Sequence, residues 1–484
     1  MDYEAVIGLE VHVQIKTKTK LFSSSKYEYG AAPNILTDEI VLGLPGSLPI
    51  INFKAIKKTL RAGLIFECTI PNLCKWDRKN YFYPDNPKNY QISQYDNPIC
   101  SGGFVEIELP GPARNLMGQH KKIALNRIQL EEDVGKLTHD AIYSMVDFNR
   151  AGVPLMEIVS EPCMATAEEA FAYLTSLKMH LCYADISDCD MEKGQLRCDA
   201  NVSLRPVGSR ALGTKVELKN LNSISGVRNG LEYEIKRQKH LLESGGTVKQ
   251  ETRKWNAETS ISSPMRSKET VDDYRYFPDP DLLPVRLETE LIDQVKLEIP
   301  ELPFRKQERF FEKYKLPYTL TSVFYPHREL CDYFEAAVKE HNNPTAIANL
   351  IANDILRELS AANSFGQMSI AECKISPLGL ANLVKFIDDG TISKQLAKEV
   401  LIEMFKTGKE ALEIINNKGL TNSLDDGTLR SLCGDIILAN PKPVNEYKNG
   451  KLTAINALKG LVMKETKAKA NPQKIDDILR KLLD

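Results

Sequence analysis

The sequence predicts an α+β fold, in which a mixed N-terminal domain with a largely antiparallel sheet is followed by two all-helical domains. Through roughly the first 290 residues, apolar and polar residues alternate in short runs, as they do in strands with one polar face. From about residue 296 the apolar residues recur at helical spacing instead. Pro278, Pro280 and Pro284 mark the change. We therefore expect domains at residues 1–294, 295–407 and 408–484.

Two runs show strand alternation most clearly. In Ala5–Ile15 the odd-numbered residues are apolar, and in Gln195–Arg205 the even-numbered residues are apolar. Thr214–Lys219 repeats the pattern after turn signals at residues 206–208 and 212–213. The last two runs therefore predict an antiparallel hairpin with one polar face.

Helices are predicted in both parts of the chain. Thr166, with Glu169 three residues later, is typical of a capping box that begins a helix. A second helix carries an apolar stripe from Val227 to Leu242 and ends at Gly245. In the second part, helices are expected at Glu308–Tyr314, Arg328–Glu340, Thr345–Leu359 and Ser376–Ile387, and another helical segment, interrupted at Asn440–Pro443, ends the chain.

The composition predicts a globular protein that does not enter a membrane. A chain of 484 residues is too long for one hydrophobic core, and 42% hydrophobic with 26% charged residues excludes extensive disorder. No apolar run approaches the ~20 residues that span a bilayer. The acidic start at Met1–Glu4 lacks the features of a signal peptide, so we expect a cytoplasmic protein.

Charge is distributed unevenly along this chain, whose net charge is −2. Residues 442–484 contain ten Lys or Arg residues and five Asp or Glu residues. A basic tail on a neutral body is compatible with a nucleic-acid partner. A solvated helical face explains the same charges equally simply.

Several standard signatures are absent from the sequence. It has no dinucleotide, nucleophile-elbow or zincin motif, and none of its ten cysteines forms a C-x-x-C pair. The run 208–215 nearly matches a P-loop, but its Lys and Thr are in the wrong order and it lies between two strands. Cys68, Cys74 and Cys100 could form a loose metal site, although reduced, buried thiols are the more ordinary interpretation.

Polar residues two apart on a strand project to the same side of a sheet. Glu10 with His12 has this spacing, as do Asp199 with Asn201 and Glu217 with Lys219, each on a different predicted strand. Carboxylates with few nitrogen ligands suit a hard cation such as Mg²⁺ better than zinc. Three such pairs in one domain favour a metal site, although any one of them is ordinary on a wet sheet face.

Three consecutive acids end the run from Arg127 to Asp133. Strict alternation puts Glu131 on the same face as Arg127 and Gln129, and Glu132 on the opposite face. A bulge at the strand end would reverse that assignment. A solvated turn is the alternative to a cation site here.

Five aromatic residues fall within residues 80–96, next to Arg78, Lys79 and Lys88. Aromatic rings interleaved with cations can stack on bases and hold phosphates. A hairpin whose rings fill a core is an equally good interpretation, and both stay open.

A series of motifs runs through the chain in a fixed order. They are IGLEVHV at residues 7–13, DRKNYFYPD at 77–85, QISQY at 91–95, EEDVG at 131–135, VSEP at 159–162, LRCDANVS at 196–203, ELKNLNS at 217–223, DYRYFP at 273–278, VMK at 462–464 and ANP at 470–472. This series resembles the B subunits of the bacterial and organellar aspartyl/glutamyl-tRNA amidotransferases, and the similarity spans essentially the whole chain.

The resemblance implies a catalytic cradle-like domain, a helical domain and a C-terminal helical domain that grips tRNA. It implies a ligase that uses ATP to phosphorylate the side-chain carboxylate of mischarged Glu-tRNA(Gln) or Asp-tRNA(Asn), after which ammonia displaces the phosphate. The ammonia comes from a partner amidase subunit that hydrolyses glutamine, and a small third subunit completes a heterotrimer. Activation is needed because a carboxylate is a poor electrophile toward ammonia.

The resemblance also implies a Mg²⁺ site. Glu10, His12, Glu132 and Asp199 match the family's Mg²⁺ ligands. Because alternation favours Glu131 over Glu132, both residues remain candidates. The ion would neutralise charge on the phosphate oxygens during transfer.

Lys79, Lys219 and Arg205 are the expected contacts to phosphate. Ala468 stands where the tail motif of the family usually has Gly, which is a small departure away from the expected site. The competing hypotheses are a non-catalytic tRNA-binding scaffold and a free-standing Mg²⁺-dependent phosphohydrolase. An acidic strand face argues against the scaffold, since phosphate is anionic, and the basic tail argues against the phosphohydrolase.

Overall fold

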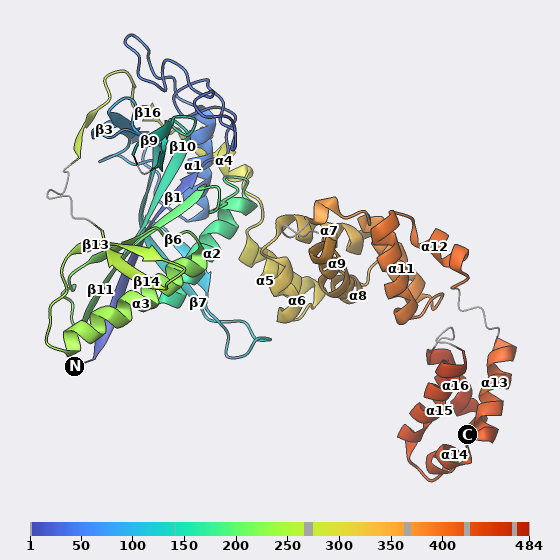
Figure 1. Cartoon of the computed structure of the whole chain (residues 1–484). Coiled ribbons are helices and arrows are strands. Elements are labelled where there is room, and N and C mark those ends of the chain that lie inside the picture. Colours follow the sequence, from blue (N-terminus) through green and yellow to red (C-terminus); the bar gives the residue numbers. More distant parts are fainter. Residues whose placement is uncertain are drawn as a thin grey trace. The chain divides into compact units, whose positions relative to one another are not determined.

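The computed structural model describes residues 2–140, 142–265, 274–362, 369–420, 426–466 and 472–483. The chain divides into two compact units, Met1–Pro303 and Phe304–Asp484 (Figure 1). The first unit contains the sheets and the second is helical, which confirms the predicted α+β class. Part of the DYRYFP motif (residue 273), Ala468 and the first two residues of the ANP motif lie outside the described residues.

The first unit is built on a nine-strand sheet, counted over the described residues. Its order is β14-β13-β12-β11-β1-β10-β7-β5, with β6 also paired to β7, and β12–β13 is the one parallel pair among these described strands. The strands are β1 (Tyr3–Gln14), β5 (Cys100–Ser101), β6 (Phe104–Glu108), β7 (His120–Glu132), β10 (Pro154–Ser160), β11 (Leu196–Pro206), β12 (Val216–Lys219), β13 (Glu251–Asn256) and β14 (Ile261–Pro264).

Three small sheets accompany this large sheet in the first unit. They are β15 (Arg275–Pro278), β3 (Asp77–Asn80) and β4 (Tyr90–Ser93); β16 (Val285–Arg286) and β2 (Leu73–Cys74); and β8 (Lys136–His139) and β9 (Ser144–Asp147). The helices of this unit are α1 (Phe53–Ile65), α2 (Ala167–Tyr183), α3 (Ile224–Glu243) and α4 (Thr289–Leu297).

One face of the large sheet is covered by α2 and α3 (Figure 1). Odd-numbered residues of β1 and even-numbered residues of β11 point into this layer. The core members are Ile7, Leu9, Val11 and Val13 of β1 and Leu196, Cys198, Ala200 and Val202 of β11. Val227 and Leu231 of α3 are fully buried in the same core. Strict alternation then directs the other side chains of β1 and β11 to the opposite face of the sheet.

The predicted elements of this unit are confirmed with small shifts. The β11–β12 hairpin is antiparallel, with Ala200 opposite Leu218. α2 begins after Thr166, whose hydroxyl accepts a hydrogen bond from the Glu169 N–H at 3.1 Å. The Glu169 carboxylate accepts from the Ala165 N–H at 2.8 Å rather than from Thr166, so the capping box is shifted by one residue.

The second unit consists of helices around two separate hydrophobic clusters. The first cluster runs from Phe310 to Ile415, and the second from Leu429 to Leu483. The helices are α5 (Pro303–Tyr314), α6 (Tyr318–Phe324), α7 (Arg328–Glu340), α8 (Pro344–Leu350), α9 (Leu356–Ala362), α10 (Pro377–Asp388), α11 (Lys394–Thr407), α12 (Ala411–Lys418), α13 (Asp426–Ala439), α14 (Pro441–Lys448), α15 (Ile455–Glu465) and α16 (Pro472–Leu483). The single helix expected at residues 345–359 contains a π-helical turn, η1 (Ile351–Ile355), and two 3₁₀ turns, η2 (Ile370–Glu372) and η3 (Leu452–Ala454), occur elsewhere in this unit.

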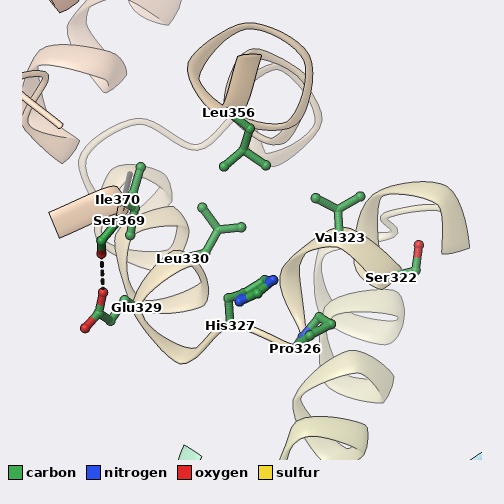
Figure 2. A pocket seen from close by; sticks show the side chains of 9 residues that line it. All are labelled: Ser322, Val323, Pro326, His327, Glu329, Leu330, Leu356, Ser369 and Ile370. Atoms are coloured by element: carbon green, nitrogen blue, oxygen red, sulfur yellow. Dashed lines mark hydrogen bonds between the residues drawn. The ribbon is translucent and has the colours of Figure 1, made fainter. Parts of the chain in front are cut away.

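A hollow of about 400 Å³ lies in this helical unit, between α6, α7 and α9 (Figure 2). Its lining is mainly apolar, and a hydrogen bond of 2.8 Å joins the Ser369 hydroxyl to the Glu329 carboxylate at one side. Burial lowers the pKa of His327, which also lines the hollow. The described lining residues include one carboxylate and one imidazole but no Lys or Arg that could pair with a phosphate.

Over the described residues, every helix is too short or too polar to cross a lipid bilayer.

Candidate active site

Three carboxylates converge on one imidazole on the polar face of the large sheet. The Nε2 atom of His12 lies 3.7 Å from a carboxylate oxygen of Glu10, 3.7 Å from one of Glu157 and 3.8 Å from one of Glu131. These separations are too long for hydrogen bonds. Two ligand atoms on opposite sides of a cation, each bound at ~2.1 Å, are ~4.2 Å apart. The distances from His12 to the three carboxylates are shorter than this limit, so one cation could contact all of these atoms.

Sheet register brings these residues together. His12 of β1 lies opposite Glu157 of β10, and Glu10 lies opposite Asp199 of β11. Residues opposite each other in a ladder share a face. Glu131 joins them from β7, which pairs with the far side of β10. The charged residues therefore come from four adjacent strands that are distant in the sequence.

Glu157 is deeply buried, with a side chain 6% exposed. Burial, together with the negative charges of Glu131 and Glu10, raises its pKa from an ordinary 4.5 to about 8. Its oxygens accept hydrogen bonds from Gln129 at 3.0 Å and Arg127 at 3.3 Å. These neighbours orient the carboxylate but do not remove the crowding of negative charge, which a bound cation would relieve.

The donor set fits a divalent cation. Glu10, His12 and Glu157 each offer one ligand atom, and these atoms all lie within 4.8 Å of one another. Two carboxylates and one imidazole suit a hard or borderline divalent ion, and the oxygen majority is compatible with Mg²⁺. The Glu10 side chain is 37% exposed, so the site opens to solvent at that end.

Asp199 lies next to this cluster, where it pairs with a cation. Its carboxylate accepts from the Lys219 ammonium at 2.9 Å, and Lys219 also lies 3.2 Å from Glu217. Burial alone would lower the pKa of Lys219, but Asp199 and Glu217 outweigh burial and raise it. Asp199 of β11 and the predicted pair Glu217 and Lys219 of β12 thus meet in one ion-paired group.

Lys79 approaches the cluster from the small sheet formed by β15, β3 and β4. Burial acts to lower the pKa of Lys79, but the charges of Glu131 and Glu157, with neighbouring tyrosines, raise it overall. Its ammonium lies 4.7 Å from the centre of the Tyr274 ring. The Lys79 side chain is therefore a charged group held between carboxylates and an aromatic face.

Glu131 and Glu132 point to opposite sides of the sheet, as alternation predicted. The carboxylate of Glu131 lies near His12, whereas that of Glu132 accepts a hydrogen bond from the Ile92 N–H at 2.8 Å and pairs with Lys88. The register irregularity of this strand pair occurs at Val159/Ser160, far from its acidic end. The geometry therefore supports Glu131, the alternative candidate, as the residue at the cation cluster.

The third acid of that run has a structural environment. The carboxylate of Asp133 accepts from Gln14 at 2.9 Å and lies 2.9 Å from Arg197. Burial would raise its pKa, but Arg197 and Arg150 hold the pKa below its usual value. Asp133 therefore anchors the end of the polar face as a buried, ion-paired carboxylate.

Arg205 is not brought to the cluster. It donates to Glu4 at 2.7 Å, at the opposite end of β1 and β11. Six residues of strand separate it from Asp199, a distance of about 20 Å. Its role as a phosphate contact therefore lacks geometric support.

Glu157 is the site residue that the sequence interpretation missed. It is the one charged residue in the buried strand Pro154–Ser160. A lone carboxylate in such a strand is costly to bury without a partner or a function. A single carboxylate in an otherwise apolar strand could therefore have indicated Glu157 as a site residue. The other candidates were recognised by a polar partner two positions away on the same strand, and Glu157 has no such partner on β10.

Cys74 and Cys100 are buried free thiols, and Cys68 is half-buried. Burial raises the pKa of Cys68 to about 12 and that of Cys74 to about 11. Among the described residues, Glu10, His12 and Glu157 form the one group with metal-ligating spacing, so Cys68, Cys74 and Cys100 do not make such a group.

The aromatic segment does not fill a core. Phe82 is 88% exposed and Tyr95 is 63% exposed. The Tyr95 ring stacks on Tyr276 at 4.4 Å, and Tyr276 lies opposite Lys79 in the small sheet. Half-buried Tyr90 packs against the main core, whereas exposed rings lie beside the carboxylate cluster, so the interpretation of exposed rings next to cations fits most of the segment.

Two family models match the chain. The GatB/GatE catalytic domain matches residues 5–293, and the GatB domain matches residues 332–483. The first of these contains the whole cluster around His12. The fold and site thus define the class of the protein, an enzyme subunit that carries a GatB/GatE catalytic domain.

Similarity to known relatives extends over the full chain. The B subunit of the aspartyl/glutamyl-tRNA(Asn/Gln) amidotransferase of Opitutus terrae is 58% identical, covering 100% of this chain and 99% of that protein. The B subunits from Thermoanaerobacter pseudethanolicus and Methylacidiphilum infernorum are 50% and 48% identical, and each alignment covers 100% of this chain and at least 99% of the relative. The chain belongs to the family of aspartyl/glutamyl-tRNA(Asn/Gln) amidotransferase B subunits, as the sequence motifs predicted.

Proposed function

We propose that this chain is the ATP-using, tRNA-binding subunit of its amidotransferase. In this proposal it transfers a phosphoryl group from ATP to the side-chain carboxylate of a mischarged Glu-tRNA(Gln) or Asp-tRNA(Asn). Ammonia then attacks the activated carbonyl carbon, phosphate leaves, and the amide remains. A partner amidase subunit supplies the ammonia from glutamine, a small third subunit completes a heterotrimer, and the complex works in the cytoplasm.

The observation that carries the proposal is the arrangement around His12. Three carboxylate oxygens lie 3.7–3.8 Å from one imidazole nitrogen. Lys219 is paired with Asp199, and the charges of Glu131 and Glu157 act on Lys79. Neighbouring carboxylates repel one another when they are ionised, so a cluster of this kind destabilises the fold unless a cation or a ligand compensates the charge. The cluster suits a substrate that carries both a metal ion and several anionic oxygens.

Each residue has a role that follows from its position. Glu10, His12 and Glu157 would hold Mg²⁺, with Asp199 beside them. When bound, Mg²⁺ supplies positive charge that stabilises the phosphate oxygens. Lys219 keeps its proton because Asp199 and Glu217 raise its pKa, so it remains a cation able to orient a phosphate.

Lys79 would act from the other side of the cluster. Its ammonium is fixed between Tyr274 and the carboxylates of Glu131 and Glu157, which raise its pKa. A half-buried cation in this place would attract an anionic group that enters the site. The stacked rings of Tyr95 and Tyr276 would offer an aromatic surface next to it.

The test is tRNA-stimulated ATP hydrolysis by the chain with its partner subunits. Asp199→Asn removes the negative charge next to the cluster while keeping the side-chain shape, and we expect turnover to fall roughly 10²-fold with tRNA binding retained. Glu4→Gln is the matched control, since Glu4 lies on the same pair of strands at the Arg205 end. Supplying Glu-tRNA(Gln) and Asp-tRNA(Asn) separately gives the substrate range.

The outcomes separate the competing functions. Loss of turnover in Asp199→Asn but not in Glu4→Gln supports the kinase role. Equal turnover in both variants and the wild type contradicts it and favours a tRNA-binding scaffold. Turnover that needs neither tRNA nor a partner subunit favours a phosphohydrolase.

A further inference from the structure

Two of the ten cysteines form a pair in the connection between α2 and β11. Cys182 lies in the last turn of α2 and is exposed. Cys189 lies in the segment that leads to β11 and is fully buried in the main core. The two thiols share a side-chain hydrogen bond. A solvent-exposed cysteine is therefore a direct neighbour of a buried one.

The backbone between the two cysteines turns back toward the end of α2. The Asp185 N–H donates to the Cys182 carbonyl at 3.0 Å, and Asp185 has a φ of 52°. Cys189 has a φ of 49°, which also lies in the left-handed region that residues with a side chain rarely adopt. The Cys182 thiol donates to the Asp188 carbonyl at 3.5 Å. Because Cys189 follows this carbonyl directly, its side chain is held beside the Cys182 sulfur.

The surroundings of Cys182 favour its thiolate. The hydrogen bond from Cys189 is the largest effect that lowers the pKa of Cys182; burial opposes it, and the charges of Lys178 and Lys16 lower the pKa further. Lys178 precedes Cys182 by one helical turn, and Lys16 is held nearby by an ion pair of 3.0 Å with Asp188. These groups outweigh the charge of Asp188, so the net change is a lower pKa. Since the thiolate is the reactive form of cysteine, Cys182 is the expected nucleophile.

Cys189 has the opposite character. The same hydrogen bond, together with burial, raises the pKa of Cys189 well above its usual range. Cys189 therefore keeps its proton and is shielded from molecules in solution. Once the Cys182 sulfur carries a leaving group, however, Cys189 is in place to attack that sulfur. The two residues thus have the properties of a nucleophilic and a resolving cysteine.

The group formed by Cys68, Cys74 and Cys100 lacks these properties. Burial raises the pKa of all three thiols. Each effect that lowers the pKa of Cys74 comes from a neutral group, and only burial and neighbouring thiols act on Cys68 and Cys100. A thiol in such an environment behaves as a small apolar side chain. The contact between two sulfurs is thus not sufficient, and the exposure and nearby lysines of Cys182 distinguish its pair.

We propose that Cys182 and Cys189 form a thiol redox pair that reacts with low-molecular-weight disulfides of the glutathione class. The Cys182 thiolate attacks one sulfur of the small disulfide, the S–S bond of that molecule breaks, and one half leaves as a thiolate. Cys189 then loses its proton and attacks the Cys182 sulfur, which releases the second half. Two protein thiols are oxidised to one disulfide, the small disulfide is reduced to two thiols, and the protons of the two cysteines end on those thiols. This pair takes no part in the proposed ATP chemistry and does not depend on it.

The disulfide would cross-link the connection that supports the end of β1. In this connection the Ile186 carbonyl accepts from the Lys16 N–H at 2.9 Å, and the Gln195 carbonyl accepts from the Gln14 N–H at 2.8 Å. The strand that follows it is β11, which carries Asp199. The redox state of small thiols would therefore act on a segment that joins two strands of the cation cluster.

The test treats the purified full chain with glutathione disulfide at pH 7, blocks the remaining thiols with iodoacetamide and analyses a trypsin digest by mass spectrometry. Trypsin cleaves after Lys178 and Lys193 and at no residue between them, so both cysteines lie in the peptide 179–193. An internal disulfide lowers the mass of this peptide by two hydrogens and excludes iodoacetamide. A mixed disulfide adds one glutathione instead. Cys163, which is also exposed, provides the internal comparison.

We expect the wild type to form the internal disulfide and to recover both thiols with dithiothreitol. Cys189→Ala should stop at the glutathione adduct on Cys182, and Cys182→Ser should leave Cys189 unmodified. Cys163→Ser is the matched control and should behave as the wild type. Without glutathione disulfide, iodoacetamide should modify Cys182 at least about threefold faster than Cys163.

Two results would overturn the proposal. One is a glutathione adduct that persists on Cys182 of the wild type at the level seen in Cys189→Ala, since Cys189 would then not resolve it. The other is modification of Cys182 by iodoacetamide no faster than that of Cys163. The second comparison needs only the wild type, so it decides the matter even if Cys189→Ala does not fold. Tryptophan fluorescence reports on folding of the variants, because Cys189 and both tryptophans belong to the same core.

Discussion

The most quantitative consequence of the carboxylate cluster concerns Glu157. Its pKa of about 8, against an ordinary 4.5, means that the folded chain holds this proton more tightly than the unfolded chain does. The resulting stability is complete below pH 4.5 and is lost as the pH rises toward 8. Between pH 4.5 and 7 the loss is about 3 kcal/mol, at 1.36 kcal/mol per pH unit.

Glu157→Gln removes this pH-dependent loss. The amide keeps the size of the side chain and cannot ionise, and its single oxygen can still accept one of the two hydrogen bonds that Arg127 and Gln129 donate to the carboxylate. In metal-free buffer we therefore expect the variant to be more stable than the wild type at pH 7, by up to about 3 kcal/mol. At pH 5 the two should differ little, since Glu157 is protonated in the folded wild type.

The assay is equilibrium unfolding in urea, followed by tryptophan fluorescence. The chain has two tryptophans, Trp76 and Trp255, and both are buried in the first unit. The signal therefore reports on the unit that contains the site and not on the helical unit. Glu192→Gln, at an exposed carboxylate, is the matched control.

Wild-type and Glu157→Gln proteins that lose the same stability from pH 5 to pH 7 would refute the reasoning. That result would mean that the three carboxylates do not repel one another as their spacing implies. Adding Mg²⁺ extends the test. The ion should stabilise the wild type at pH 8 by relieving the repulsion, and should stabilise Glu157→Gln much less.

Three further predictions concern stability away from the cation cluster. Thr166→Ala removes the hydroxyl that caps α2 and should lower the free energy of unfolding by about 1 kcal/mol in the tryptophan assay, whereas Thr166→Ser should be nearly neutral. Leu458→Ala opens a cavity in the last hydrophobic cluster and should cost about 2–4 kcal/mol there, measured as faster amide exchange in α15 and α16 with tryptophan unfolding unchanged; a shift in the tryptophan midpoint would contradict this independence. Burial lowers the pKa of Lys20 to about 8, so the stability of the first unit should fall as the pH drops from 10.5 to 8 and then level off. Lys20→Met should flatten that dependence by about 3 kcal/mol, and an unchanged slope would show that Lys20 is not desolvated.

Local sequence patterns determined the strands and most of the helix ends. The alternation in β1 and β11 predicted correctly which side chains face the core. Successive side chains of a strand point to opposite faces, so burying the apolar set on one face places every other side chain on the opposite face. The same rule placed Glu131 on the polar face and Glu132 on the other. The signals for the start of α2 and the end of α3 worked because capping depends on residues within one helical turn.

The composition of the site was only partly predictable. Glu10, His12 and Asp199 were found because each has a polar neighbour two residues away on its own strand. Glu157 was missed because its partners are on other strands. The sequence also could not separate Arg205 from Lys219, since both are basic residues near the same hairpin, whereas the register places them at opposite ends of it.

The sequence by itself thus determined which residues can share a face and, through its motifs, the family to which the chain belongs. Only the tertiary structure decided which faces meet. Strand order brings β7, β10, β1 and β11 side by side although about 60 residues separate β7 from β11. The physical reason is that the alternation of side chains depends only on the residues of one strand. Which strands pair depends on how the whole sheet is buried under α2 and α3. The cluster around His12 is a product of that pairing.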